Sequence, residues 1–334
     1  MTPAAEDESA GALPLRAVFF GSGAFALPIL EAAQRAPEID LVAVISTPDR
    51  PAGRRAELTP TPIASAARDA GLPLLQPASL REPAAVQRIL ELRPDVGILA
   101  DYGRIVPPAI LGAFPRGILN VHPSLLPRYR GATPIPAAIV AGDDRFGVTL
   151  IELVDRLDAG PIIAAADWAA RGDETGPLLE AAAARAGATL LTASLGPWLA
   201  GRLLARAQDE SQADLTRPLR REDGLLDLGR PAVLLERQVR ALGGWPGTYV
   251  LIGDVRAVVL EAKVVSGESQ APTTGGGGPA IDVGRVVPVG DGLGVRTPDG
   301  ILELVRVQPA GGRPMSGAEL RRGRPGLLGS AVGS

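Results

Sequence analysis

The sequence lacks two residue types on which much enzyme chemistry depends. None of its 334 residues is cysteine, and His122 is the only histidine. The absence of cysteine excludes disulfides and thiolate nucleophiles. One histidine without cysteine makes a poor zinc site, so we expect no metal. Any acid–base chemistry near neutral pH points first to His122, because no other side chain present ordinarily titrates there.

Long hydrophobic runs are also missing. No apolar stretch reaches the roughly 18 residues of a membrane span. The first twelve residues are small and acidic, without the basic and apolar regions of a signal peptide. We therefore expect a cytoplasmic protein that crosses no membrane, and we expect it to be a monomer.

Aromatic residues and net charge are sparse as well. Aromatics make up 3% of the chain against 46% for all hydrophobic residues, so aliphatic side chains and alanine must fill the cores. A net charge of −3 gives no global signal for nucleic-acid binding, although it permits a local basic surface. The length suggests two domains or one large one.

The first part of the chain alternates short apolar runs with helical stretches. The runs cover 16–20, 41–45, 96–100 and 117–121, and the helical stretches include 24–35 and 179–205. Continuous runs of this kind are typical of parallel strands buried on both faces. We predict a disordered tail over 1–13 and an α/β domain with a Rossmann-like parallel sheet over 14–206.

The pattern changes after residue 206. Residues 207–223 are polar without helical periodicity, which indicates a linker. A helix over 232–242 precedes β-rich runs at 248–252, 256–265, 283–289, 293–296 and 301–307, separated by turn signals. This pattern predicts a small OB-like β-barrel domain over 224–330. The glycine-rich segment 266–280 reads as a flexible loop inserted in the barrel.

Gly21-Ser22-Gly23 follows the first run and opens a helix, as a dinucleotide-binding turn does. An NAD-dependent oxidoreductase is therefore one hypothesis. No acidic residue stands at the tip of the second run, where such folds bind the ribose. The other interpretation is a strand-to-helix turn in which glycine relieves crowding.

Asn120, His122 and Asp158 form a second candidate site. Asn120 and His122 alternate on an extended chain, so both can face one side at the carboxyl end of a strand, where open parallel sheets bind ligands. Asp158 can arrive from a separate turn and orient the imidazole. An amide and an imidazolium can both donate to a developing oxyanion. This set suits acyl transfer to an amine, which needs no protein nucleophile.

Arginines form a third group. Arg50, Arg54 and Arg55 lie in a segment with two prolines and a glycine, which predicts no regular element. Arg128 and Arg130 flank a tyrosine just after the histidine motif. These side chains can be read either as a grip on nucleic-acid phosphates or as solvated surface.

Two motifs carry a resemblance to a known family. Asn-x-His-x-Ser-Leu-Leu-Pro at 120–127 and Leu-Asp-x-Gly at 157–160 are similar to the signature of the folate-dependent formyltransferases. The resemblance implies that Asn120, His122 and Asp158 are catalytic. It implies 10-formyltetrahydrofolate as cosubstrate. The implied folate contacts are Ser124, Leu125, Leu126 and Pro127, with Leu99, Asp101, Tyr102 and Gly103 around the pterin.

Further segments resemble the branch of this family that formylates methionyl-tRNA. They are 76–81, 48–54, and 308–311 together with 315–316. The resemblance implies initiator methionyl-tRNA as partner and places Arg54 in the loop that engages its acceptor end. We expect the tRNA contacts to be Arg50, Arg54, Arg55, Arg128 and Arg130. The alternatives are a formyltransferase for a small amine such as a nucleotide sugar, the oxidoreductase, and a tRNA-binding protein with an inactive site.

Overall fold

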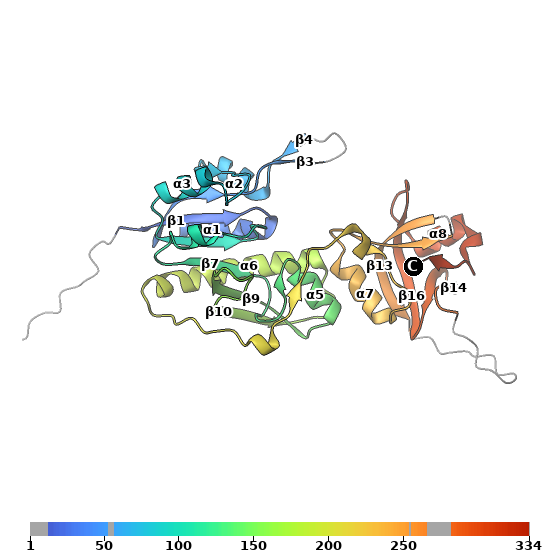
Figure 1. Cartoon of the computed structure of the whole chain (residues 1–334). Coiled ribbons are helices and arrows are strands. Elements are labelled where there is room, and N and C mark those ends of the chain that lie inside the picture. Colours follow the sequence, from blue (N-terminus) through green and yellow to red (C-terminus); the bar gives the residue numbers. More distant parts are fainter. Residues whose placement is uncertain (1–12, 53–56, 254, 266–281, 334) are drawn as a thin grey trace, which may run out of the picture. The chain divides into compact units, whose positions relative to one another are not determined.

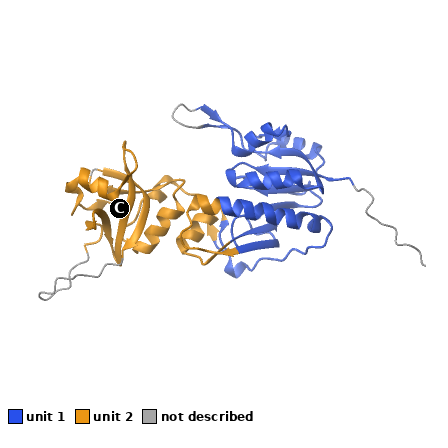
Figure 2. Cartoon of the chain, turned by 180° about the vertical axis from the view of Figure 1, so that it is seen from behind, with its two compact units in different colours: residues 1–130, 147–167, 181–214 blue, residues 131–146, 168–180, 215–334 orange. Residues whose placement is uncertain are grey.

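The structure is a computed structural model that describes residues 13–52, 57–253, 255–265 and 282–333. Its contacts define two compact units (Figure 2). The first comprises residues 1–130, 147–167 and 181–214, and the second comprises 131–146, 168–180 and 215–334. The domain limits predicted above stay a prediction. The predicted tail, apart from Leu13, and the glycine-rich segment 266–280 lie outside the described residues.

A seven-stranded sheet is the frame of the first unit, in the order β10-β9-β7-β6-β1-β2-β5 (Figure 1). Its strands are β1 (Leu15–Gly21), β2 (Ile39–Ile45), β5 (Leu74–Leu75), β6 (Val96–Ala100), β7 (Ile118–His122), β9 (Arg145–Glu152) and β10 (Ile162–Ala169). The four predicted strands pair in parallel, which confirms the Rossmann-like fold class. The sheet is mixed, however, because β9 runs antiparallel to β7.

Helices flank this sheet on both faces. They are η1 (Ala24–Ala26), α1 (Leu27–Arg35), α2 (Pro62–Asp69), α3 (Pro83–Glu91), α4 (Pro108–Leu111) and α6 (Gly176–Leu199), and a short turn η2 (Glu210–Gln212) lies in the predicted linker. The predicted helix 179–205 was too long: α6 stops at Leu199. Gly201 then takes a left-handed φ of 69°, which ends a helix readily.

The alternation of side chains in β7 sets the position of the candidate site. Ile118 packs with Phe20 of β1, Ile89 of α3 and Ile110 of α4 in one hydrophobic cluster. Val121 points to the opposite face, where a Cβ on Gly187 of α6 would lie 2.7 Å from it. Residues 120 and 122 therefore share the side of Ile118, at the carboxyl end of the strand.

The arginine segment forms a hairpin, so the prediction of no regular element was wrong. β3 (Arg50–Ala52) pairs antiparallel with β4 (Glu57–Thr59). Cross-strand pairing between segments on either side of 53–56 overrides the local proline and glycine signals. The hairpin stands out from the sheet (Figure 1), and its Leu58 is 73% exposed.

The second unit contains an antiparallel sheet in the order β14-β15-β16-β13-β12-β18, with β17 paired to β16. Its strands are β12 (Thr248–Ile252), β13 (Val255–Val265), β14 (Val286–Val289), β15 (Gly292–Thr297), β16 (Gly300–Pro309), β17 (Met315–Ser316) and β18 (Val332–Gly333). A bridge between Arg285 and Ala331 joins the two ends of this order. The sheet therefore curls back on itself, which confirms the predicted small barrel.

Helices complete the second unit: α5 (Pro134–Ala141), α7 (Ala232–Ala241), α8 (Gly317–Gly323), η3 (Arg221–Gly224) and η4 (Pro325–Leu327). Leu235 and Val239 of α7 enter the barrel core beside Val250 and Val259. A two-stranded ladder pairs β8 (Arg130–Gly131) with β11 (Leu215–Thr216). Within the described residues, we find no helix with the length and apolarity needed to span a bilayer.

Candidate active site

The site is built at the carboxyl end of β7. His122 is its last residue, and Asn120 lies two residues earlier; each is only 5% exposed. In the sheet, Asn120 lies opposite Leu99 of β6, and His122 lies opposite Thr149 of β9. The two polar side chains are therefore held by strands on both sides, at the edge where open α/β sheets bind ligands.

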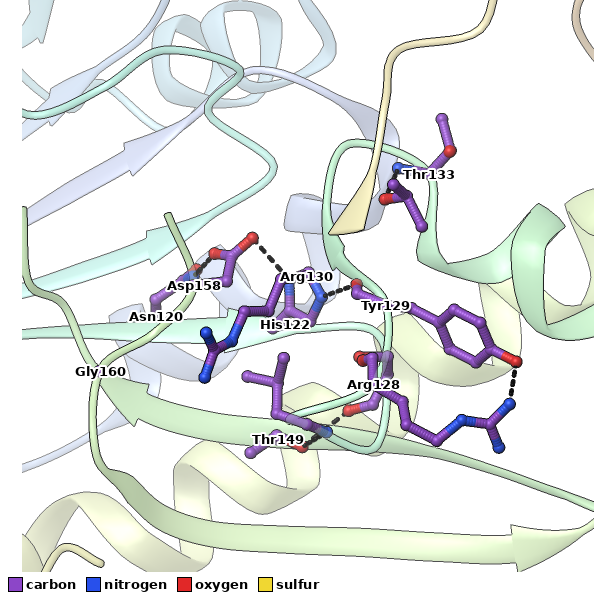
Figure 3. A network of polar contacts seen from close by, with 12 residues as sticks. Asn120, His122, Arg128, Tyr129, Arg130, Thr133, Thr149, Asp158 and Gly160 are labelled. Carbon is purple, nitrogen blue, oxygen red and sulfur yellow. Dashed lines mark hydrogen bonds and ion pairs between the residues drawn. The ribbon is translucent and has the colours of Figure 1, made fainter. Parts of the chain in front are cut away.

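Asp158 comes to these side chains from the turn after β9. Asn120 Nδ2 donates to Asp158 Oδ1 at 3.1 Å, and Asp158 Oδ2 lies 3.6 Å from His122 Nδ1 (Figure 3). Asp158 as a whole is 7% exposed. The structure thus brings together all three residues of the predicted set, although 38 positions separate Asn120 from Asp158.

The turn that carries Asp158 is conformationally demanding. Asp158 has a φ of 48°, in the left-handed region that side chains other than glycine rarely adopt. Two residues later, a Cβ on Gly160 would lie 1.7 Å from the carbonyl oxygen of Glu152. The Asp-x-Gly spacing therefore has a structural reason: only glycine allows the turn to return this close to β9.

His122 is also fixed from its other side. Its Nε2 lies 2.9 Å from the carbonyl oxygen of Tyr129 (Figure 3). A carbonyl only accepts, so Nε2 carries a proton and donates it. Nδ1 is therefore the ring atom that faces Asp158 and the one that can exchange a proton there.

The turn between His122 and Tyr129 holds the predicted folate contacts Ser124, Leu125, Leu126 and Pro127. Its shape is set by Thr149, which accepts from the Leu126 amide at 3.1 Å and donates to the Ser124 carbonyl at 2.7 Å. The Ser124 hydroxyl donates to the Arg128 carbonyl at 2.7 Å. The motif thus lies next to His122 in a fixed conformation.

The second group of predicted folate contacts follows β6. Because Leu99 pairs with Asn120, residues 101–103 begin beside the Asn120–His122 end of β7. Asp101 and Gly103 are exposed. The Tyr102 ring is buried in the core against Phe20, and burial raises the pKa of its phenol to about 12. Any contact of Tyr102 with a ligand would therefore involve its main chain.

The predicted tRNA contacts differ in how exposed their side chains are. Arg50 is exposed on the β3–β4 hairpin, and Arg54 and Arg55 lie outside the described residues. Arg128 is exposed, with its guanidinium 4.6 Å from the Tyr129 ring centroid. Arg130 is 4% exposed and paired with Glu210, so its guanidinium is committed within the protein rather than presented to RNA.

The Gly21-Ser22-Gly23 turn has the structural role that crowding predicts. The amides of Ser22 and Gly23 both donate to the Asp101 carbonyl, at 3.0 and 3.2 Å. A Cβ on Gly23 would lie 1.7 Å from the Asp101 carboxylate. The amides that a dinucleotide phosphate would need are therefore already engaged, which argues against the oxidoreductase.

Two contributors to the site were missed in the sequence. Gln208 and Glu210, in the polar segment interpreted as a linker, contact the Asp158 turn and Arg130. No local periodicity marks them, because their partners lie about 50 to 80 positions away. Among the described residues, no group of three or more histidine, aspartate or glutamate side chains could hold a metal ion.

This fold and site define the formyl transferase class. The Formyl transferase family matches residues 15–195, and the Formyl transferase C-terminal domain matches 218–325. An N-formyltransferase from Helicobacter canadensis, solved with folinic acid and dTDP-3-aminofucose, has the same fold, with a TM-score of 0.63. It is 15% identical, over 87% of this chain and 98% of its own.

Curated relatives indicate the branch of this family to which the chain belongs. The methionyl-tRNA formyltransferase of Chloroflexus aggregans is 44% identical over 91% of this chain and 96% of its own length. That of Thermus thermophilus is 37% identical over 96% and 99%. The chain belongs to the methionyl-tRNA formyltransferase family, which confirms the resemblance drawn from its motifs.

Proposed function

We propose that this enzyme transfers a formyl group from 10-formyltetrahydrofolate to the α-amino group of initiator methionyl-tRNA, in the cytoplasm. The observation that carries the proposal is the buried contact of Asp158 with both Asn120 and His122. Family membership supports the acceptor. The folate in the Helicobacter canadensis structure supports the class of donor.

The residues present fit a folate donor. Residues 124–127 and 101–103 border the Asn120–His122 end of β7 on two sides, one as its continuation and the other through the pairing of β6. A ligand held by these two segments would bring its formyl group to the buried polar side chains. When bound, it supplies an activated formyl group on nitrogen.

Asn120 would stabilise charge on the formyl oxygen, whereas His122 has no N–H left for it, since Nε2 donates to Tyr129 and Nδ1 faces Asp158. As the amine lone pair forms the new N–C bond, the carbonyl electrons move onto oxygen. Asn120 uses one Nδ2–H on Asp158 and has a second to donate to this oxygen. Removing one such donor typically lowers the rate by about 10²- to 10³-fold.

Asp158 and His122 would move the proton. The attacking amine must lose one proton, and the departing folate nitrogen must gain one when its C–N bond breaks, so no net proton is consumed. Asp158 Oδ2 accepts the first proton and passes it to Nδ1 of His122, because Tyr129 holds Nε2. The imidazolium then stands beside the carboxylate until this proton moves on to the folate nitrogen. An imidazole and a carboxylate 3.6 Å apart can carry out both steps without a protein nucleophile.

Arg50 and Arg128 would bind the acceptor through its phosphates, because both side chains are exposed and Arg128 lies in the turn that follows His122. Binding of this kind weakens steeply as salt rises. A flat salt response of the acceptor KM would remove the tRNA assignment while leaving a formyltransferase.

The test is a formylation assay with the full chain, with and without 10-formyltetrahydrofolate. The acceptors are charged initiator methionyl-tRNA, the same tRNA uncharged, and a nucleotide amino sugar. Formylation of the charged tRNA alone, and only with donor, is expected. Preference for the sugar would overturn the acceptor, and binding of a nicotinamide cofactor without folate would overturn the whole proposal.

A further inference from the structure

A set of hydrogen-bonded polar side chains connects the turn that carries Asp158 with the segment that contacts His122. Gln208 Nε2 donates to two carbonyl oxygens of the Asp158 turn, that of Asp158 itself at 2.8 Å and that of Gly160 at 2.7 Å. A turn with a left-handed non-glycine residue needs such outside support, because its conformation is not the one its own backbone prefers.

The orientation of the Gln208 amide is determined by its partners. Its Oε1 accepts from Nε and Nη2 of Arg130, at 3.0 and 2.8 Å. A flipped amide would set its NH₂ against a guanidinium and its oxygen against two carbonyls, which is unfavourable at both ends. Gln208 therefore accepts from Arg130 on one side and donates to the Asp158 turn on the other.

Arg130 is fixed in turn by Glu210. Its buried guanidinium pairs with both carboxylate oxygens, at 2.9 and 3.1 Å. Glu210 also accepts from Arg156 at 2.9 Å, and Arg156 lies in the Asp158 turn. The contacts thus form a closed ring that starts and ends in this turn.

The same segment holds the histidine. Tyr129, the neighbour of Arg130, supplies the carbonyl that accepts from His122 Nε2. Asp214 accepts from the Tyr129 amide with its side chain and from the Arg130 amide with its carbonyl. Residues 129–130 therefore fix the orientation of the His122 ring directly and the position of the Asp158 turn through Gln208.

We propose that Gln208, oriented by Arg130, is a positioning residue for formyl transfer: it fixes the Asp158 turn so that the carboxylate faces His122 Nδ1. This inference rests on the proposed function. A misplacement of about 1 Å in such a pair can lower a rate about 100-fold.

The decisive variant is Gln208→Glu. A carboxylate of the same shape keeps the contact with Arg130 but loses both donors and faces two carbonyl oxygens. We expect kcat per folded site to fall by about 10- to 100-fold, with KM for tRNA and folate unchanged. If Gln208 acted only as packing for Arg130, this variant would keep wild-type kcat, and that result would overturn the inference.

Folded sites are counted by the stoichiometry of folinic acid binding, so a loss of folded protein does not imitate a loss of kcat. Gln34→Glu, the same change at an exposed position of α1, is the matched control and should behave as wild type. If Gln208→Glu does not fold, Arg156→Met tests the ring from its exposed end, where Arg156 is 66% accessible. A several-fold fall in its kcat supports the inference, and an unchanged kcat overturns it.

The wild-type enzyme in the same assay separates the two proposals. If the wild type does not formylate methionyl-tRNA, the proposed function fails. If it does, and Gln208→Glu matches it, only the positioning role fails.

Discussion

Replacement of Asp158 by asparagine removes the charge of the site while keeping its shape. The new amide can still accept from Asn120 through its oxygen, as the carboxylate does at 3.1 Å. What it loses is the negative charge 3.6 Å from His122 Nδ1 and the ability to take a proton. The variant therefore isolates the electrostatic and proton-accepting contribution from the packing of the turn.

The expected loss follows from the distance. Unit charges 3.6 Å apart attract by about 4–5 kcal/mol at an effective dielectric constant of about 20. This attraction applies only as charge develops on the imidazole, so it lowers the barrier rather than strengthening substrate binding. The loss corresponds to a fall in kcat of about 10³-fold, with KM little changed.

The assay is single-turnover formylation of charged tRNA with saturating 10-formyltetrahydrofolate. Asp155→Asn is the matched control, because Asp155 is an exposed carboxylate in the same turn. It should retain wild-type activity. If Asp158→Asn retained a rate within about threefold of wild type, less than 1 kcal/mol would be involved, and the proposed role of this pair would be refuted.

Three further outcomes are expected. Gly160→Ala should lower the free energy of unfolding by about 1–3 kcal/mol in urea titrations, because its Cβ meets the Glu152 carbonyl; an unchanged midpoint would mean that the turn relaxes freely. Arg50→Gln should raise the tRNA KM and reduce its log–log salt slope by about 1, whereas Arg35→Gln, at another exposed arginine, should do neither. Arg130 and Arg156 lower the pKa of the Glu210 carboxyl from 4.5 to about 2. The two ion pairs therefore stabilise the folded state fully above pH 4.5, and this stabilisation is lost as the pH falls toward 2. The Tm advantage of wild type over Glu210→Gln should shrink across that range, and a constant difference would contradict this.

Local pattern predicted the parts of the fold that local pattern determines. Continuous apolar runs identified the central strands, and turn signals identified those of the barrel. The strand at Arg145–Glu152 was not identified, and neither was the β3–β4 hairpin. Each depends on a partner strand for its stability, and pairing between distant segments leaves little trace in a window of ten residues.

The candidate site divides in the same way. The alternation of Asn120 and His122 predicted a shared face, and the sheet-edge rule predicted where it lies. The position of Asp158 beside these two residues was expected from the Leu-Asp-x-Gly motif, not from geometry. The left-handed turn and its support by Gln208 could not be read from the chain, because a glutamine in a polar stretch has the same local appearance whether it is solvated or buried against distant carbonyls.

The order of strands in the barrel has a practical consequence. β13 and β14 follow one another in the chain but are not neighbours in the sheet, since β15 and β16 lie between them. The two strands therefore do not form a hairpin with each other. The entropy of closing a loop rises only logarithmically with its length. An engineer who needs to attach a fluorophore, an affinity peptide or a tether should graft it between Val265 and Asp282, because residues 284–285 bond to the strands that close the barrel.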